Sequence, residues 1–247
     1  QSYWSISWNI FKKNKVAMVC LFIVILLCLI ALFAPLIAPY DPNKQVLTDR
    51  LMKPCGQHWF GTDDLGRDIF SRIIYGCRVS LSVGIISQII ATVIGYTMGV
   101  CAGYFGGKVD SVISFLIQVF SSFPFLLFAM AIMFVLALGL LGWASTARLI
   151  RGDVMRLKKM EYIDACKVSG GNSFRIIMKH LLPNCLSTLI VTVTLGIPNA
   201  IMSEASLSFL GLGVKAPMAS WGSMISFSQP YIRSATYYSV IPGLAII

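Results

Sequence analysis

Residues 161–183 form a polar segment between long apolar runs, and they carry the side chains best suited to contact another molecule. Between residues 148 and 182 the chain has eight Lys or Arg residues and only three acidic ones. A basic cluster of this kind beside an apolar span marks the cytoplasmic side of a membrane protein. The chemistry available to it is electrostatic docking on a partner surface, and an ordinary solvated loop is the alternative.

This basic segment is expected to form two short helices. Glu161 and Asp164 suit the first turns of a helix, where the helix dipole stabilises carboxylates. Gly170 and the glycine after it supply the positive φ that ends a helix. Asn172 or Ser173 can then cap the helix that follows. The segment is therefore a pair of short helices rather than a span.

The second short helix should have one apolar face and one basic face. Ala165 and Cys166, in the first helix, have small side chains that leave room for a partner surface to come close. Small residues in the first helix and an amphipathic second helix together suit a loop that docks on a partner. The expected faces are Phe174, Ile177, Met178 and Leu181 on one side and Arg175 and Lys179 on the other.

Three uncharged polar side chains inside apolar runs could line a path for a polar substrate: Gln118, Ser122 and Asn199. Such groups also serve as hydrogen-bonding partners between helices, each worth about 1 kcal/mol or less. The sequence leaves both interpretations open.

A ridge of small residues runs along one apolar stretch, with Ser87, Ala91, Gly95, Gly99 and Gly103 recurring every four residues. In a helix this spacing places them on one face, where another helix can approach closely. The ridge is therefore a helix-packing face. Whether its partner lies in this chain or in another subunit stays open.

The composition identifies an integral membrane protein. Of 247 residues, 57% are hydrophobic and 12% are charged, whereas soluble domains are about a quarter charged. The formal net charge of +10 arises beside apolar spans, so it reflects membrane topology and argues against a nucleic-acid partner. Seven scattered cysteines without a CxxC motif indicate neither a disulfide framework nor a zinc site. The two histidines, His58 and His180, are expected on the surface on opposite sides of the membrane, so no metal site is predicted.

The first span is predicted over residues 16–37, an uncharged run of 22 residues. As a helix it would be about 33 Å long, enough to cross a hydrocarbon core of about 30 Å. Lys12, Lys13 and Lys15 precede it and place the N-terminus in the cytoplasm. Residues 1–15 are expected to form an amphipathic segment in the membrane interface.

The remaining chain is predicted to alternate between spans and loops. Residues 38–78 are polar and should form an extracytoplasmic loop, and the second span should begin at residue 79. Residues 79–247 would then make up the core of the membrane domain, with the basic loop at 148–182 inside it. The expected fold is an all-α polytopic membrane protein with about six transmembrane helices.

The apolar stretch Ser111–Ala147 has 37 residues, which is short for two spans. Either one long tilted helix crosses there, or residues near 138–142 are missing. A further span is expected at Leu181–Ser203, followed by an outer segment at residues 204–238. Val240–Ile247 would be the opening of a last, truncated helix.

The order Asp164-Ala165-Cys166, then Gly170, then Leu182-Pro183, resembles the Glu-Ala-Ala, Gly, Leu-Pro loop of binding-protein-dependent ABC importer permeases. Asp and Cys here replace Glu and Ala of that pattern. Three further segments resemble the C-type permease subunit of the dipeptide, oligopeptide and nickel importers: residues 11–15 leading into 38–42, residues 58–72, and residues 204–213 with Trp221-Gly222.

In that family the loop docks on an ATPase subunit. The resemblance implies a type I ABC importer permease fold, in which two related permease subunits form a heterodimeric pore in the bacterial cytoplasmic (inner) membrane. Two ATP-binding subunits would bind ATP and Mg, and an extracellular or periplasmic binding protein would deliver the substrate. This chain would bind no cofactor and catalyse no reaction. The resemblance assigns coupling to Glu161, Tyr162, Asp164, Ala165, Cys166 and Gly170.

The family transports di- and oligopeptides, and import of nickel or a metal chelate is the alternative. The predicted spans contain no charged residue or histidine, which argues against coupling to an ion gradient. A passive channel or scaffold subunit is the competing hypothesis from another class. An intramembrane enzyme lacks support, because the sequence has no Gly-x-Ser-x-Gly elbow and no pair of intramembrane aspartates.

Overall fold

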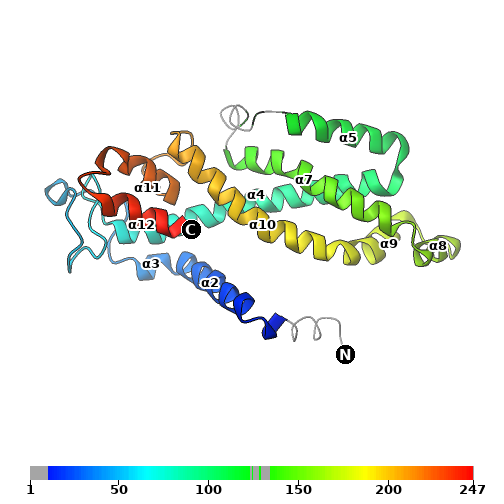
Figure 1. The fold of residues 1–247 in the computed structure, drawn as a ribbon, viewed down its shortest axis with the longest axis horizontal. Helices are drawn as coiled ribbons and strands as arrows, with labels where there is room; N and C mark the ends of the chain where they lie inside the picture. The colour runs from blue at the N-terminus through cyan, green and yellow to red at the C-terminus, as the bar shows by residue number, and fades with distance from the viewer. Residues whose placement is uncertain (1–10, 123, 125–127, 129–133, 247) are drawn as a thin grey trace. The chain divides into compact units, whose positions relative to one another are not determined.

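The computed structural model describes residues 11–122, 124, 128 and 134–246. Apart from one isolated bridge between Thr62 and Asp68, the regular secondary structure in these ranges is helical. The chain divides into two compact units, Gln1–Leu81 with Val214–Ile247, and Ser82–Gly213 (Figure 1). The expected amphipathic segment at residues 1–15 falls largely on residues 1–10, which lie outside the described ranges.

The first unit begins with α2 (Lys15–Leu32), which is apolar on all sides. Asn14 caps this helix by accepting hydrogen bonds from the backbone N–H groups of Val16 and Ala17. The helix ends earlier than the predicted span 16–37, because Pro35 cannot donate a backbone hydrogen bond. A separate short helix, α3 (Ala34–Ile37), follows with that proline in its first turn.

The second long helix, α4 (Ile69–Phe105), starts ten residues before the predicted span. The last ten residues of the predicted loop 38–78 are therefore helical, and the extracytoplasmic position of this segment stays a prediction. The polar side chains that suggested a loop are buried against other parts of the same unit. Ser71 and Arg72 are the clearest examples, being 0% and 1% exposed.

The loop before α4 is folded around buried ion pairs. Asp63 accepts hydrogen bonds from the backbone N–H of Leu65 and Arg67, and the Nε of Arg67 donates to its other oxygen at 2.6 Å. His58 Nδ1 lies 2.9 Å from Asp68 Oδ1, and the histidine side chain is only 11% exposed. The prediction of His58 as a surface residue is therefore wrong.

The rest of the first unit consists of η1 (Leu47–Asp49), α11 (Trp221–Ser228), η3 (Gln229–Tyr231) and α12 (Thr236–Ile246). A capping box formed by Ser220 and Ser223 starts α11. The helices α11 and α12 pack on each other. Ile69, the first residue of α4, completes their apolar core. The buried members of this core are Ile69, Ala219, Met224, Ala235 and Tyr238.

The second unit contains the rest of α4, α5 (Gly107–Ser122), α7 (Phe134–Leu157), α8 (Glu161–Val168), α9 (Ser173–Ile176), the π-helical turn η2 (Ile177–Leu181) and α10 (Leu182–Phe209). The stretch Ser111–Ala147 thus contributes to two helices, so the alternative of one long helix is wrong. These helices, α5 and α7, lie side by side (Figure 1). Positive φ angles at Gly106 and Gly107 allow the sharp turn from α4 into α5.

Within the described ranges, three helical stretches are long and apolar enough to cross a membrane by length and composition: Lys15–Leu32, Ile69–Phe105 and Ser173–Phe209. They extend beyond the apolar runs of the sequence and so include charged side chains near their ends. Arg72 and Arg78 lie in α4, and Glu204 lies in α10, where it is fully buried. These three charged residues lie outside the apolar runs predicted as spans, so the prediction that the spans themselves carry no charged group stays a prediction.

Candidate functional site

The helix α8 ends in a hydrogen-bonded turn that the sequence specifies. Gly170 adopts φ +79°, its N–H donates to the carbonyl of Lys167 at 3.0 Å, and the N–H of Gly171 donates to the carbonyl of Cys166 at 2.9 Å. These two bonds define a Schellman C-cap, which favours glycine at the left-handed position. Asn172 then caps α9 by accepting from the N–H of Arg175 at 2.8 Å. The predicted first short helix and the Asn172 cap are confirmed, but the second helix is not short, because α9 continues through η2 into α10 as one helical stretch, Ser173–Phe209.

The first of these helices is anchored to the longer helices by one side chain. Ile163 is 0% exposed and packs in an apolar cluster with residues of α4, α7, α9, η2 and α10. Cys166 adds a polar contact, because its Sγ lies 3.1 Å from Nε2 of His180. His180 is partly buried, contrary to the surface position predicted for it. The cluster members are Val100, Ile150, Val154, Leu157, Ile163, Ile176, Leu181 and Cys185.

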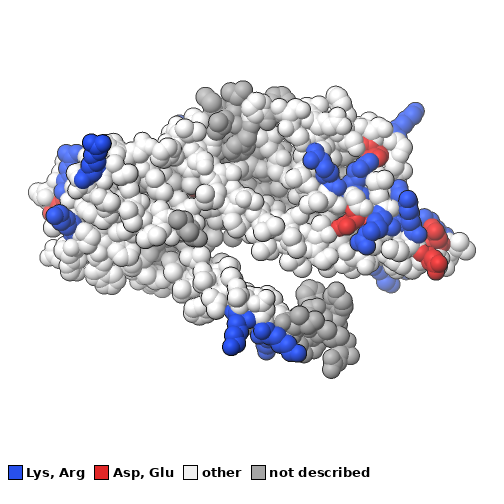
Figure 2. All heavy atoms as spheres, viewed as in Figure 1, with Lys and Arg blue, Asp and Glu red and all other residues white. Residues whose placement is uncertain are grey.

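The opposite face of α8 is exposed. Glu161, Tyr162, Asp164 and Ala165 all lie there, whereas Cys166 faces the protein. Lys167 Nζ donates a hydrogen bond to Asp164 at 2.8 Å, and this bond raises the pKa of Lys167. Figure 2 shows Lys and Arg side chains gathered at the end of the unit that carries α8. The exposed face can therefore dock a partner through charged and small residues.

Two apolar side chains near this face in the chain are strongly exposed. Val168 is 89% exposed and Phe174 is 72% exposed. The sequence placed Phe174 and Met178 on the apolar face of the second helix, but both are exposed, and the buried residues are Ile176 and Leu181. The π-helical turn η2 inserts an extra residue into the helix, so a pattern with a strict 3.6-residue period gives the wrong face.

The small-residue ridge of α4 packs against α7 in the same chain, which answers the question left open by the sequence. A Cβ added at Gly95 would lie 2.6 Å from Cβ of Thr146, and one at Gly99 would lie 2.7 Å from the carbonyl oxygen of Ala147. At Gly103 it would lie 2.8 Å from Cβ of Val154. Ala91 continues the contact, because a Cβ added at Gly142 would lie 3.2 Å from the Cβ of Ala91.

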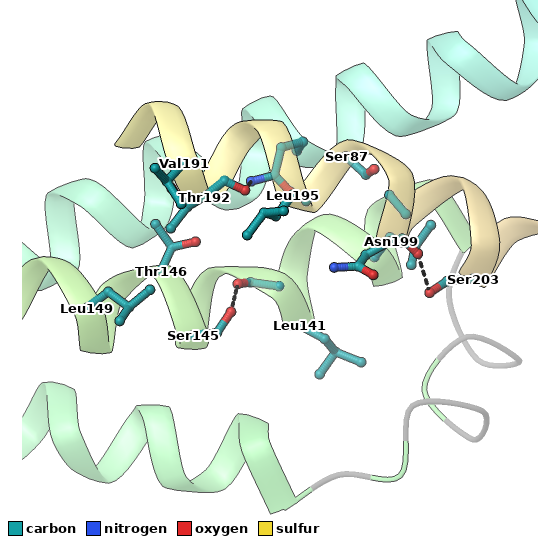
Figure 3. A pocket seen from close by; sticks show the side chains of 15 residues that line it. Ser87, Leu141, Ser145, Thr146, Leu149, Val191, Thr192, Leu195, Asn199 and Ser203 are labelled. Atoms are coloured by element: carbon teal, nitrogen blue, oxygen red, sulfur yellow. Dashed lines mark hydrogen bonds between the residues drawn. The ribbon is translucent and has the colours of Figure 1, made fainter. Parts of the chain in front are cut away.

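An open cavity of about 470 Å³ lies between α4, α7 and α10 (Figure 3). The side chain of Gln88 reaches from α4 to α10. Its Nε2 donates to Thr92 Oγ1 at 3.2 Å and to the carbonyl of Thr192 at 3.4 Å. Gly196 makes room for this side chain, since a Cβ there would stand 2.0 Å from Gln88 Oε1. The polar residues lining the cavity are Ser87, Gln88, Ser145, Thr146, Thr192, Asn199 and Ser203.

The structure separates the three residues predicted to line a path. Asn199 lines this cavity. Gln118 and Ser122 lie on α5, where they border a different and more open hollow with Phe115, Val119 and Pro124. The sequence did not predict the other polar residues of the cavity. Ser and Thr are common in membrane spans, and only the packing of three helices brings the polar lining residues together.

Among the described residues, no group of three or more His, Cys, Asp or Glu side chains is placed to hold a metal ion. The described residues that line the cavity have no ionisable side chain.

Comparisons with known proteins agree with this arrangement. Residues 91–247 match the family described as binding-protein-dependent transport system inner membrane component, and residues 2–54 match the N-terminal TM domain of oligopeptide transport permease C. The dipeptide transport system permease protein DppC of Bacillus subtilis (strain 168) is 43% identical over 96% of this chain and 77% of that protein. The oligopeptide transport system permease protein OppC of the same strain is 40% identical over 96% and 80%.

Other relatives and a solved structure extend the likeness. The glutathione transport system permease protein GsiD of Pectobacterium atrosepticum is 37% identical over 98% of this chain and 84% of that protein. An inward-facing structure of the MetNI methionine ABC transporter has a TM-score of 0.53 at 19% identity, covering 72% of this chain and 89% of that chain. This last match supports the type I permease fold alone.

The family match covers more than half of the chain, and the relatives span nearly all of it. The fold class and the family inferred from the sequence are confirmed. The chain belongs to the inner membrane components of binding-protein-dependent transport systems, the permease subunits of ABC importers.

Proposed function

We propose that this chain forms one half of the translocation path of an ATP-driven importer for di- or oligopeptides. A related permease subunit would supply the other half, in a bacterial cytoplasmic membrane with the N-terminus of this chain in the cytoplasm. An external binding protein would deliver the peptide. The names of the relatives support the substrate class, since they are permeases of dipeptide and oligopeptide transport systems.

The observation that carries the proposal is a mechanical connection. Ile163 of α8 is buried in an apolar cluster that includes Val100 of α4, Ile150 of α7 and Cys185 of α10. The same three long helices wall the cavity. A partner that moves α8 would therefore move the helices around the path, because close-packed cores transmit displacement.

Two partner ATPase subunits, with bound ATP and Mg, would supply that movement by docking on the exposed face of α8. Asp164 and Ala165 lie on this face, and Val168 and Phe174 add apolar surface. The basic residues around the face suit an acidic partner surface. A helix that docks in a groove buries apolar surface there, and it needs small residues for close approach and exposed apolar side chains as anchors.

The test is ATP hydrolysis by the complete complex in proteoliposomes, with and without its peptide-loaded binding protein. Ala165→Arg should leave the basal ATPase rate in place and abolish its stimulation by the binding protein. Lys13→Ala, a charge change near α2, serves as the control and should keep the stimulation. Unchanged stimulation in Ala165→Arg would show that α8 does not couple the two activities.

A further inference from the structure

The lining of the cavity between α4, α7 and α10 combines apolar side chains with uncharged polar ones. A charged group bound against the described lining residues would find no counter-ion there. The lining also contains no carboxylate, imidazole or thiol, which are the side chains that bind nickel and similar metals. A neutral polar group is therefore the chemistry that this cavity favours.

Most hydroxyl groups in the lining already donate their protons within their own helix. Ser87 Oγ donates to the carbonyl of Val83 at 2.7 Å, Ser145 Oγ to that of Gly142 at 2.9 Å, and Ser203 Oγ to that of Asn199 at 2.8 Å. These hydroxyls can still accept hydrogen bonds but have no free proton to offer.

The side-chain amide of Asn199 differs from these hydroxyls. Asn199 is exposed, and within the described part of the chain no hydrogen bond involves its Oδ1 or Nδ2. Figure 3 shows this side chain extending from α10 into the space that faces α7. It therefore offers both a donor and an acceptor to whatever occupies the cavity.

We propose that Asn199 binds the main-chain amide of the transported peptide. The carboxamide of Asn199 can donate to the carbonyl oxygen of a peptide bond or accept from its N–H. Recognition of this kind does not depend on the peptide's side chains. The uncharged lining would also not select peptides by the charge of their side chains. The inference rests on the proposed function and adds a residue that contacts the substrate.

The experiment compares two peptides in proteoliposomes that contain the complete importer with its binding protein. One peptide is trialanine, and the other is trialanine methylated on the nitrogen of its first peptide bond, which removes one donor. The discrimination ratio is the uptake rate of trialanine divided by that of the methylated peptide. Because the binding protein is the same throughout, changes in this ratio between variants arise in the membrane subunits.

Asn199→Leu should lower the discrimination ratio by about two- to tenfold relative to the wild type, the range for loss of one hydrogen bond. Thr194→Val, on the same helix but outside the cavity, should leave the ratio unchanged. Asn199→Gln, which restores the carboxamide, should recover part of it. ATP hydrolysis stimulated by the binding protein reports whether each variant is folded and coupled.

An unchanged ratio in a coupled Asn199→Leu complex would overturn the role of Asn199 and leave the proposed function standing. Equal loss of uptake for both peptides would also overturn it, because a merely structural defect does not distinguish them. If the wild-type complex shows no ATP-dependent peptide uptake at all, the proposed function fails and takes this inference with it.

Discussion

The guanidinium of Arg151 on α7 donates two hydrogen bonds to the carboxylate of Asp110 on α5, from Nε to Oδ1 at 2.5 Å and from Nη2 to Oδ2 at 2.7 Å. Close by, Nζ of Lys158 donates to the carbonyl of Gly103 on α4 at 2.7 Å. These bonds fasten α4, α5 and α7 together at the end of the unit that carries α8. A displacement of α8 would therefore act on three helices that are held together by these hydrogen bonds.

The pair of Arg151 and Asp110 should contribute measurably to stability. Each side chain is partly exposed, so the coupling energy should be about 1 kcal/mol, below that of a fully buried charged pair. A double-mutant cycle with Arg151→Ala and Asp110→Ala, followed by denaturation of the purified protein in detergent, measures it. If the two single effects simply add, the bidentate pair does not stabilise the fold.

The close approach of α4 and α7 makes Gly99 sensitive to a single methyl group. Gly99→Ala would place its Cβ 2.7 Å from the carbonyl oxygen of Ala147, which forces the helices apart. We expect a loss of about 1–3 kcal/mol in the free energy of unfolding. Gly152→Ala on α7 is the matched control, because no atom lies within 4 Å of the added Cβ. That variant should be neutral or slightly more stable.

The C-cap of α8 depends on the backbone conformation of Gly170 rather than on space around it. Its φ is +79° and no atom lies within 4 Å of an added Cβ. Gly170→Ala should therefore cost about 1–2 kcal/mol locally, and hydrogen exchange of the amides of α8 should speed up. Gly170→Asn should be milder, because Asn tolerates this conformation. Equal exchange in Gly170→Ala and wild type would contradict the assigned cap.

Thiol labelling tests the proposed membrane topology. Cys55 is exposed in the loop before α4, and Cys166 is partly exposed on α8, whereas Cys77 and Cys185 are buried. In intact cells a membrane-impermeant maleimide should label Cys55 and leave Cys166 unlabelled. In inverted vesicles the order should reverse, and in both cases the buried pair serves as the unreactive control. Labelling of Cys55 and Cys166 from the same side would refute the topology.

The sequence predicted what local chemistry determines. The glycine that ends α8 and the Asn172 cap of α9 follow from side chains that act within a few residues. The small-residue ridge of α4 follows from a repeat of four along one helix. The family could also be inferred, because the order of Asp164, Gly170 and Pro183 is specific to it.

Tertiary structure decided the points on which the sequence failed. The polar residues at the start of α4 appeared to belong to a loop, but their partners, such as Asp63, are supplied by the folded loop before the helix. The π-helical turn shifted the buried face onto Ile176 and Leu181, and no residue type announces such a turn. The cavity required α4, α7 and α10 to be placed together, which single-helix patterns cannot do.

In the proposed function, peptide movement through this chain is driven by ATPase subunits acting through α8. The most direct measurement is uptake of labelled peptide into proteoliposomes that contain the permease pair, with the binding protein present, compared with and without the ATPase subunits and ATP. Accumulation above the external concentration should occur only when both are supplied. Accumulation that persists in their absence would contradict the account.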